Sequence, residues 1–383
     1  MRNYFFTLFC ILLPYLATAQ AFHIQGKLVD SDSQLPVDFA TIYVAHENKG
    51  TISNEEGVFS LEVNQLPCTL LIYHLSYQRD TICVHDTNHV EISLIPSPII
   101  LEEVTVNYIE NLLARVHANM QDDSTQLYST TFYRQTTRLD SKRQPTEIKE
   151  MFYWTASDNK GMTSCVLDQG RYARTTGSSF TNFSQYTKTL RFNADLLLVG
   201  QPATQHLSYT RGQSFDQGKV VEIKYGCEQC KNIGSLYIDT QNNTLLRWRF
   251  DLFENTGFWA LSSSDSNAKI DVQKYVFDIN YRTINSITIV ESLKVDLYFT
   301  KGEKRKMQQF HVSSIAWFYD YTTSPKLDIT YQTVLEDDFA AIKNKKYDAP
   351  FWENNPVITR TSGEKAAIKL FEKDKIFETN VRQ

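Results

Sequence analysis

Cys227 and Cys230 form the sharpest local pair of chemically reactive residues in the sequence. A Cys-x-x-Cys pair acts as a redox dithiol when the first cysteine lies at a helix N-terminus, where the dipole lowers the thiol pKa. The flanking stretches, 220–225 and 234–238, have the composition of strands, so we expect the pair in a hairpin loop. We favour a local disulfide; the alternatives are two free thiols, or redox or metal chemistry.

The other reactive residue types do not form a recognised catalytic or metal-binding motif. The eight histidines are scattered, and the sequence contains neither His-x-x-Glu nor His-Glu-x-x-His, the ligand patterns of zinc peptidases. It also lacks a Gly-x-Ser-x-Gly elbow and a glycine-rich phosphate loop. We therefore predict no catalytic, cofactor-binding or metal-binding residues, no cofactor, and no enzymatic activity.

Trp317, Tyr319 and Tyr321 alternate along one long predicted strand, so a regular strand would place all three rings on one face. Such a face could stack on a sugar or hold an acyl chain. The favoured interpretation is a core packed beneath a helix, because aromatic side chains on strands most often fill cores.

Residues 1–19 have the pattern of a secretory signal peptide. Arg2 is followed by an apolar run, 4–16, and then by the small residues Ala17, Thr18 and Ala19. The apolar run is shorter than the roughly 20 residues that span a bilayer. We expect a mature chain that begins at Gln20 and is exported to the periplasm, or lies peripherally on the outer membrane, with no transmembrane helix after cleavage.

Length and composition indicate a two-domain β protein. At 383 residues the chain is too long for one ordinary core, and its 23 Phe and 21 Tyr favour strands. The net charge of −5 argues against a nucleic-acid partner. Of six cysteines, Cys10 lies in the predicted signal peptide, so an odd number remains and at least one thiol is unpaired.

The segment 20–96 is predicted to be a small β-sandwich, because short alternating stretches are separated by turn signals. The predicted strands are 22–29, 37–44, 58–63, 70–75, 81–84 and 90–95. Cys68 and Cys83 are symmetric about a turn near Ser76, so a hairpin would place them opposite one another. Both a cross-strand disulfide and two small buried side chains fit this spacing.

Specific residues in this segment carry a family resemblance: Ile24, Gly26, Leu28, Asp30, Pro36, Ala40, Thr41, Ile42, Gly50, Thr51, Gly57, Phe59, Leu75, Tyr77 and Leu94. Together with the following segment 101–106, residues 22–107 resemble the carboxypeptidase-regulatory-like domain common in exported Bacteroidetes proteins. The resemblance implies an Ig- or transthyretin-like sandwich, with Gly50 and Gly57 bracketing a tight turn and Phe59 facing the core. Ser76 replaces the family's usual glycine, so its turn should not need a positive φ.

Residues 97–126 are predicted to be a linker with a short helix, since apolar residues recur at helical spacing from Ile109 to Met120. Residues 127–335 are then predicted to form a larger curved antiparallel sheet, a meander of strands in sequence order. Within it, residues 193–199 are predicted to be a short helix or lid. Its predicted strands include 146–156, 219–225, 234–239, 245–252, 270–279, 286–300 and 307–321. The hairpin around 234–248 resembles the half-barrel of periplasmic lipoprotein carriers.

Residues 336–383 are predicted to form an aromatic loop, 347–356, and a helix. Thr361 and Glu364 have the spacing of a capping box, which places the helix start there. The aromatic loop should anchor this tail to the sheet.

Three functional hypotheses follow from these features. The leading one is a non-enzymatic cell-envelope protein that serves as an interaction or binding module, with outer-membrane or other envelope proteins, or an apolar ligand, as partners. The alternative is a periplasmic carrier of lipid or acylated cargo in a half-barrel cavity. The third is an enzyme whose site is assembled from distant residues. Specific activity is expected in the sheet after Leu127 rather than in the recognised module.

Overall fold

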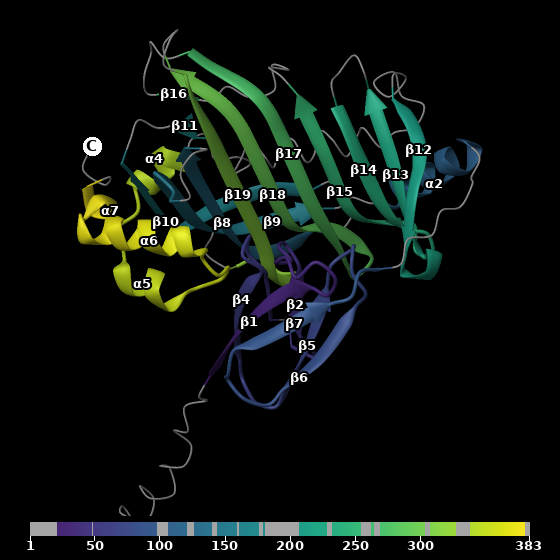
Figure 1. The fold of residues 1–383 in the computed structure, drawn as a ribbon, viewed down its shortest axis with the longest axis horizontal. Helices are drawn as coiled ribbons and strands as arrows, with labels where there is room; N and C mark the ends of the chain where they lie inside the picture. The colour runs from purple at the N-terminus through teal and green to yellow at the C-terminus, as the bar shows by residue number, and fades with distance from the viewer. Residues whose placement is uncertain are drawn as a thin grey trace, which may run out of the picture.

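The computed structural model describes residues 21–47, 49–97, 106–120, 126–139, 144–158, 161–175, 179–180, 207–227, 232–253, 262–263, 269–302, 307–326 and 338–379 (Figure 1). The predicted signal peptide, the predicted helix or lid at 193–199, and Cys230 lie outside these residues.

The N-terminal part is a sandwich of two small sheets, with strand orders β4-β1-β7 and β3-β2-β5-β6. Alternate residues along the strands turn inward, and Ile24, Leu28, Phe59 and Leu70 are fully buried in the shared core. β1 pairs antiparallel with β4 and parallel with β7. The strands are β1 (Phe22–Asp30), β2 (Thr41–Val44), β3 (Gly50–Ile52), β4 (Val58–Val63), β5 (Cys68–Tyr73), β6 (Asp80–Val84) and β7 (Val90–Leu94).

Gly57 supports its predicted role in a tight turn. Its φ is +73°, and a Cβ built there would lie 2.4 Å from the carbonyl oxygen of Leu28, so only glycine fits. Gly50 instead begins β3, where the ring of Tyr43 approaches to 2.5 Å of a built Cβ. Ser76 has no positive φ, as its side chain predicted.

The large sheet contains ten strands in the order β10-β9-β8-β19-β18-β17-β15-β14-β13-β12. The predicted simple meander is wrong at one point, because β8 pairs with the last strand, β19, rather than continuing along the sheet. The chain therefore lays its first three strands on the far side of its last one. The strands are β8 (Leu127–Leu139), β9 (Glu147–Asp158), β10 (Gly161–Arg174), β12 (Ser208–Phe215), β13 (Val220–Cys227), β14 (Asn232–Asp239), β15 (Thr244–Phe253), β17 (Lys269–Ile284), β18 (Ile287–Gly302) and β19 (Gln308–Thr322).

The inner face of this curved sheet carries the main core. Buried side chains from β8–β10 and from β13, β14, β15, β17, β18 and β19 belong to one continuous cluster, so the two ends of the sheet curl around a shared interior. Helix α2 (Val106–Asn119) packs Ile109, Leu112 and Val116 into that cluster. It begins three residues before the predicted start. Two short strands, β11 (Ser179–Phe180) and β16 (Ser262–Ser263), form a separate pair.

The C-terminal segment covers the outer face of β8 and β9 with short helices (Figure 1). They are α5 (Ala349–Asn354), α6 (Ser362–Lys373) and α7 (Ile376–Thr379). Helix α4 (Asp338–Lys343) lies on the inner face instead, where Ile342 joins the main core and Asp338 pairs with Lys149 of β9 at 2.8 Å. Thr361 and Glu364 form the predicted capping box, and the predicted aromatic loop contains α5, whose Trp352 is buried. Because both faces of β8 and β9 are covered, their burial pattern loses the usual alternation.

The mainly β fold class predicted from the sequence, a small sandwich followed by a larger antiparallel sheet with a few helices, is confirmed.

Candidate functional site

Of the two interpretations of Cys68 and Cys83, the cross-strand disulfide does not form in the structure, where both are free thiols. Cys68 lies opposite Val84 and Cys83 opposite Thr69, so the hairpin register is one residue away from the expected pairing. A one-residue shift turns the two side chains to opposite faces, which leaves Cys68 buried and Cys83 exposed. Cys227 ends β13, but its side chain and Cys230 lie outside the described part of the chain.

The predicted aromatic row on β19 is divided between two faces. Trp317 and Tyr319 pack on the outer face in a core shared with the sandwich, while Tyr321 joins the inner core. The cause is an irregular register after Tyr319, where Asp320 adopts a φ of +54°. Trp317 is 1% exposed, so this surface is a packed core, as the favoured interpretation predicts, and not a binding platform.

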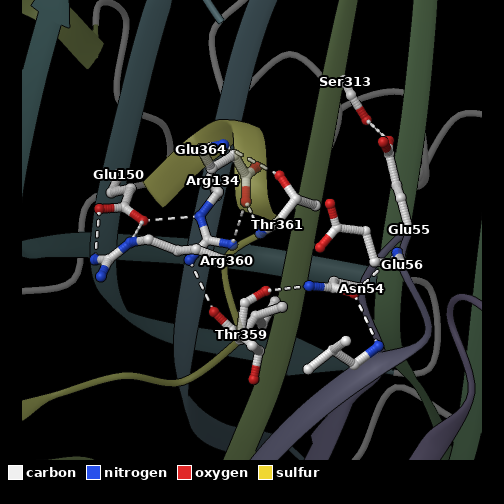
Figure 2. A network of polar contacts seen from close by, with 12 residues as sticks. Asn54, Glu55, Glu56, Arg134, Glu150, Ser313, Thr359, Arg360, Thr361 and Glu364 are labelled. Atoms are coloured by element: carbon white, nitrogen blue, oxygen red, sulfur yellow. Dashed lines mark hydrogen bonds and ion pairs between the residues drawn. The ribbon is translucent and has the colours of Figure 1, made fainter. Parts of the chain in front are cut away.

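The recognised turn of the sandwich contacts the C-terminal tail (Figure 2). Asn54 Nδ2 donates to the carbonyl oxygen of Thr359 at 3.1 Å. The carboxylate of Glu56 accepts the backbone N–H of Ser362 at 3.0 Å, at the start of α6. Nearby, Thr51 Oγ1 donates to the carbonyl of Val357 at 2.8 Å. The stretch 50–59 therefore joins the sandwich to the tail.

Behind this contact, the buried carboxylate of Glu150 is held by three arginines, of which Figure 2 shows Arg134 and Arg360. Glu150 accepts from Arg134 Nε at 2.7 Å, from Arg171 Nε at 2.8 Å and from Arg360 Nη2 at 3.1 Å. Burial alone would raise the pKa of Glu150, but the charges of the three arginines outweigh it and hold that pKa well below its ordinary value. We call Glu150, Arg134, Arg171 and Arg360 the ionic lock.

The ionic lock ties the tail to the sheet, since Arg360 belongs to the tail and the other members to β8–β10. Arg134 extends it, donating to the carbonyl of Ile358 at 2.8 Å and to Glu364 at 3.3 Å. Glu372 lies 3.4 Å from Arg171, so with Glu364 the three arginines have three carboxylate partners, as buried ion pairs require. The ionic lock therefore holds the tail in position on the sheet.

His311 is the described histidine that comes nearest to a catalytic arrangement. Its Nε2 lies 2.7 Å from Asp296 Oδ1, and its Nδ1 accepts from Arg138 Nε at 3.0 Å. Because Nδ1 accepts, Nε2 carries the proton and donates it to Asp296, so both ring nitrogens are engaged. Among the described residues, no group of three His, Cys, Asp or Glu side chains could hold a metal ion.

A groove of about 1500 Å³ lies between the outer face of the β2-β5 sheet and the neighbouring ends of the large sheet. The sandwich contributes Tyr43 from β2 and Tyr73 from β5, both on the face opposite its core. The other wall is formed by the strand ends and hairpins of β12 to β18, with Phe215, Arg247 and Arg282 among its side chains. This groove is the candidate ligand site.

One end of the groove is bounded by a polar contact between the two walls. Tyr43 Oη donates to the buried Glu291, and Arg282 Nη1 donates to Tyr43 Oη at 2.9 Å while its guanidinium lies 4.6 Å over the Tyr43 ring. Burial raises the pKa of Glu291, against the opposing effects of Tyr43 and Arg282. Among the ion pairs of the described residues, the cation at Glu291 is Arg282, whose Nη1 is 4.0 Å away and so farther than the arginines of Glu150.

Two further side chains that line the groove, His74 and Arg79, affect its charge. Burial, together with the charge of Arg247, lowers the pKa of His74 to about 4, so its ring is neutral at neutral pH. Arg79 reaches across from the sandwich to Asp216 on η4 (Asp216–Gly218) at 3.7 Å. Side-chain exposures of 68% for Arg79 and 39% for Asp216 make this a weak bridge that a ligand could displace.

Sequence reasoning missed both the ionic lock and the groove. The lock had one local signal, a charged residue directly after two aromatic residues in Phe132-Tyr133-Arg134, but its partners are distant in sequence. The groove residues come from the sandwich, α2 and many strand ends, so no spacing pattern links them.

Comparison with curated proteins finds no match in sequence. Among solved structures, a lipovitellin structure described by its lipid–protein interactions aligns at 7% identity and a TM-score of 0.26, over 54% of this chain and 26% of that one. A DUF1329 family protein from Desulfovibrio piger aligns at 11% identity and a TM-score of 0.26, over 59% of this chain and 95% of that one. Structural similarity at this level supports no conclusion about the function of this protein.

The N-terminal sandwich gives the informative comparison. Residues 24–106 match the family model of the CarboxypepD_reg-like domain, which ends where α2 begins. Domains of this family are regulatory and Ig-like rather than catalytic. In the described residues, no helix has both the length and the apolar character needed to cross a membrane. The turn at Gly57, the buried Phe59 and the family match agree: residues 24–106 are a CarboxypepD_reg-like domain.

Proposed function

We propose that this protein is a non-enzymatic, exported binding protein of the bacterial cell envelope, and that it holds its ligand in the groove between the CarboxypepD_reg-like domain and the large sheet. The observation that carries the proposal is the groove itself, about 1500 Å³ between two walls that are fixed by contacts beside it. Clefts at domain boundaries are where ligand sites most often occur. Export rests on the signal-peptide pattern of residues 1–19, and the bacterial source on the Bacteroidetes resemblance.

The walls of the groove are held by contacts outside it, which favours a preformed site. Lys294 Nζ on β18 donates to Asp38 of the sandwich at 2.6 Å, and Arg138 Nη1 on β8 donates to Glu55 at 3.4 Å. Phe39 and Ile52 of the sandwich share a buried core with Trp352 of the tail. A preformed groove loses little conformational entropy when it binds.

The lipid-carrier alternative would use the inner face of the large sheet. There, Trp248, Phe250 and Phe277 are at most 2% exposed, and the rings of Phe250 and Phe277 stack 4.5 Å apart. Side chains with so little accessible surface do not border a void large enough for solvent. In the described part of the sheet, this favours the groove over the inner face as the ligand site.

Site-specific photo-crosslinking in the exporting cells tests the proposal. A photoreactive amino acid at position 73, inside the groove, should give a discrete adduct, whereas the same group at position 128, on β8 and outside the groove, should not. Equal adducts at both positions, or none at 73, would contradict the proposal. Organic extraction of the purified protein followed by mass spectrometry tests the alternative, because a carrier should release lipid in near-stoichiometric amount.

A further inference from the structure

The shape and lining of the groove define the class of its ligand. We infer that the groove binds an extended segment of a partner protein, about seven residues long and without excess charge. This inference rests on the proposed function, since it names the ligand of the same site. It follows from the length, the side-chain types, the charge balance and the backbone of the groove walls.

The length of the groove follows from the strands that border it. Its lining includes residues at the ends of β18, β17, β15, β14, β13 and β12, which are consecutive neighbours in the sheet. Neighbouring strands lie about 4.8 Å apart, so five spacings give about 24 Å. An extended chain advances about 3.3 Å per residue, so about seven residues fill the groove.

The side-chain types are those of protein-binding surfaces. Aromatic residues and arginine are enriched at the centre of protein–protein interfaces, and lysine is depleted there. Among the described residues that line the groove there is no lysine. The aromatic and arginine residues that line it are Phe39, Tyr43, Tyr73, Tyr77, Phe215, Tyr281, Arg79, Arg247 and Arg282.

The charges of the lining are nearly balanced, since besides those three arginines it contains four acidic residues, Glu47, Asp216, Asp239 and Glu291. Arg247 is moreover paired with Asp278, with Nε 2.7 Å from the carboxylate. A polyanion or an acidic membrane surface needs concentrated positive charge, which these walls do not provide. An acyl chain, in turn, would leave these charged and amide groups desolvated without partners. A polar chain with apolar side groups meets both conditions.

The groove offers amide side chains instead of a free strand edge. Its sandwich wall is made by β2 and β5, which are both interior strands of their sheet, so a peptide cannot extend that sheet there. Gln78, Asn242 and Asn280 also line the groove. A primary amide carries both donors and an acceptor, which matches the N–H and C=O groups of an extended peptide. Recognition would therefore run through side chains.

Tyr73 is the expected anchor of this interaction. It is 37% exposed, unusually high for a large ring on the face of an interior strand, and the flexible Arg79 lies 5.6 Å from its ring centroid. A bound apolar side chain can displace Arg79 and cover the ring. Tyrosine supplies such contact area at low entropic cost.

Selection from a displayed library of random heptapeptides against the full exported chain tests the inference. Enriched sequences are then measured as synthetic peptides by fluorescence polarisation, with wild type, Tyr73→Ala, Gln78→Ala and the matched control Tyr128→Ala. We expect binding to weaken by about tenfold or more in Tyr73→Ala and less in Gln78→Ala. The control should stay within about twofold of wild type.

Parallel probing with an array of neutral and acidic oligosaccharides separates the inference from the proposed function. Binding of an oligosaccharide that is lost in Tyr73→Ala, with no peptide enriched, would overturn the peptide inference and leave the groove as a binding site. Peptides that bind Tyr73→Ala as tightly as wild type would overturn both. A library that yields no enriched peptide overturns the inference.

Discussion

Two regions join the CarboxypepD_reg-like domain to the rest of the molecule. Each contains a buried glutamate, and the pKa values of the two glutamates are shifted in opposite directions. On the tail side, Glu150 is surrounded by three arginines and its pKa lies well below the ordinary value. On the groove side, the buried Glu291 has a tyrosine and one more distant arginine, and its pKa is raised. The difference indicates that the tail side is built to hold the domain in place, while the groove side keeps polar and aromatic groups available for a ligand.

The largest expected effect is the loss of the central carboxylate of the ionic lock. Glu150→Ala removes the one fully buried carboxylate that all three arginines share and should lower the free energy of unfolding by about 4 kcal/mol. The matched control is Glu372→Ala, which removes a 45% exposed partner of Arg171 at 3.4 Å and should cost less than about 1 kcal/mol. Urea denaturation of both variants measures the difference; equal costs would show that the lock does not hold the tail.

The second-largest loss of stability is expected when Trp352, the aromatic residue that anchors the tail, is replaced. Trp352 is 3% exposed and packs against Phe152 with ring centroids 5.5 Å apart. Trp352→Ala should therefore cost about 3 kcal/mol through lost burial and the cavity left behind. Proteolysis of the native protein should then cleave the tail first. Uniform protection of the tail in this variant would contradict its role as an anchor.

Asn54 should matter less, because it contributes hydrogen bonds rather than apolar burial. Its Oδ1 accepts from the backbone N–H groups of Glu56 and Val58, both at 2.9 Å, while its Nδ2 bonds the tail. Asn54→Ala should lower stability by about 1–2 kcal/mol. Asn64→Ala, at an exposed pair of hydrogen bonds, is the control and should change stability by less than about 0.5 kcal/mol.

The two buried carboxylates should respond to pH with opposite signs. Glu291 has a raised folded-state pKa, so its ionised form costs stability, and that cost appears as pH rises above the unfolded value. The stability of Glu291→Gln relative to wild type should therefore increase as the pH rises above the ordinary glutamate value of about 4. Glu150 has a lowered pKa, so its stabilisation is present above the unfolded value and lost on acidification.

Denaturation curves across this pH range check both signs. Glu150→Gln should be most damaging near neutrality and less so in acid, and Glu291→Gln should show the reverse trend. If the stabilities of the two variants, relative to wild type, changed with pH in the same direction, the proposed difference between the two regions would be contradicted.

The smallest effect on stability is expected for the groove anchor. Tyr73→Ala removes a partly exposed ring and should change the free energy of unfolding by less than about 0.5 kcal/mol. Thermal denaturation checks this value. A large loss of stability would mean that Tyr73 belongs to the packed contact between the walls rather than to an open site.

Local patterns account for the elements that were predicted correctly. The alternation in β1 and β4, the helical spacing of α2 and the capping box at Thr361 each depend on residues a few positions apart. β3 was missed because three residues are too short for a period, and β10 because it mixes polar and apolar residues without regular alternation. Cys68 and Cys83 were misplaced because spacing alone cannot fix a register to one residue.

The sandwich, its turn at Gly57, its buried Phe59 and the family match of residues 24–106 could all be predicted from the sequence. These features depend on the backbone preferences and burial of neighbouring residues, which a short pattern records. The contact between Arg360 of the tail and Glu150 of β9, and the groove that Tyr73 and Arg282 both line, exist only in the folded chain. Such contacts join residues from distant strands, and their geometry depends on the curvature of the whole sheet.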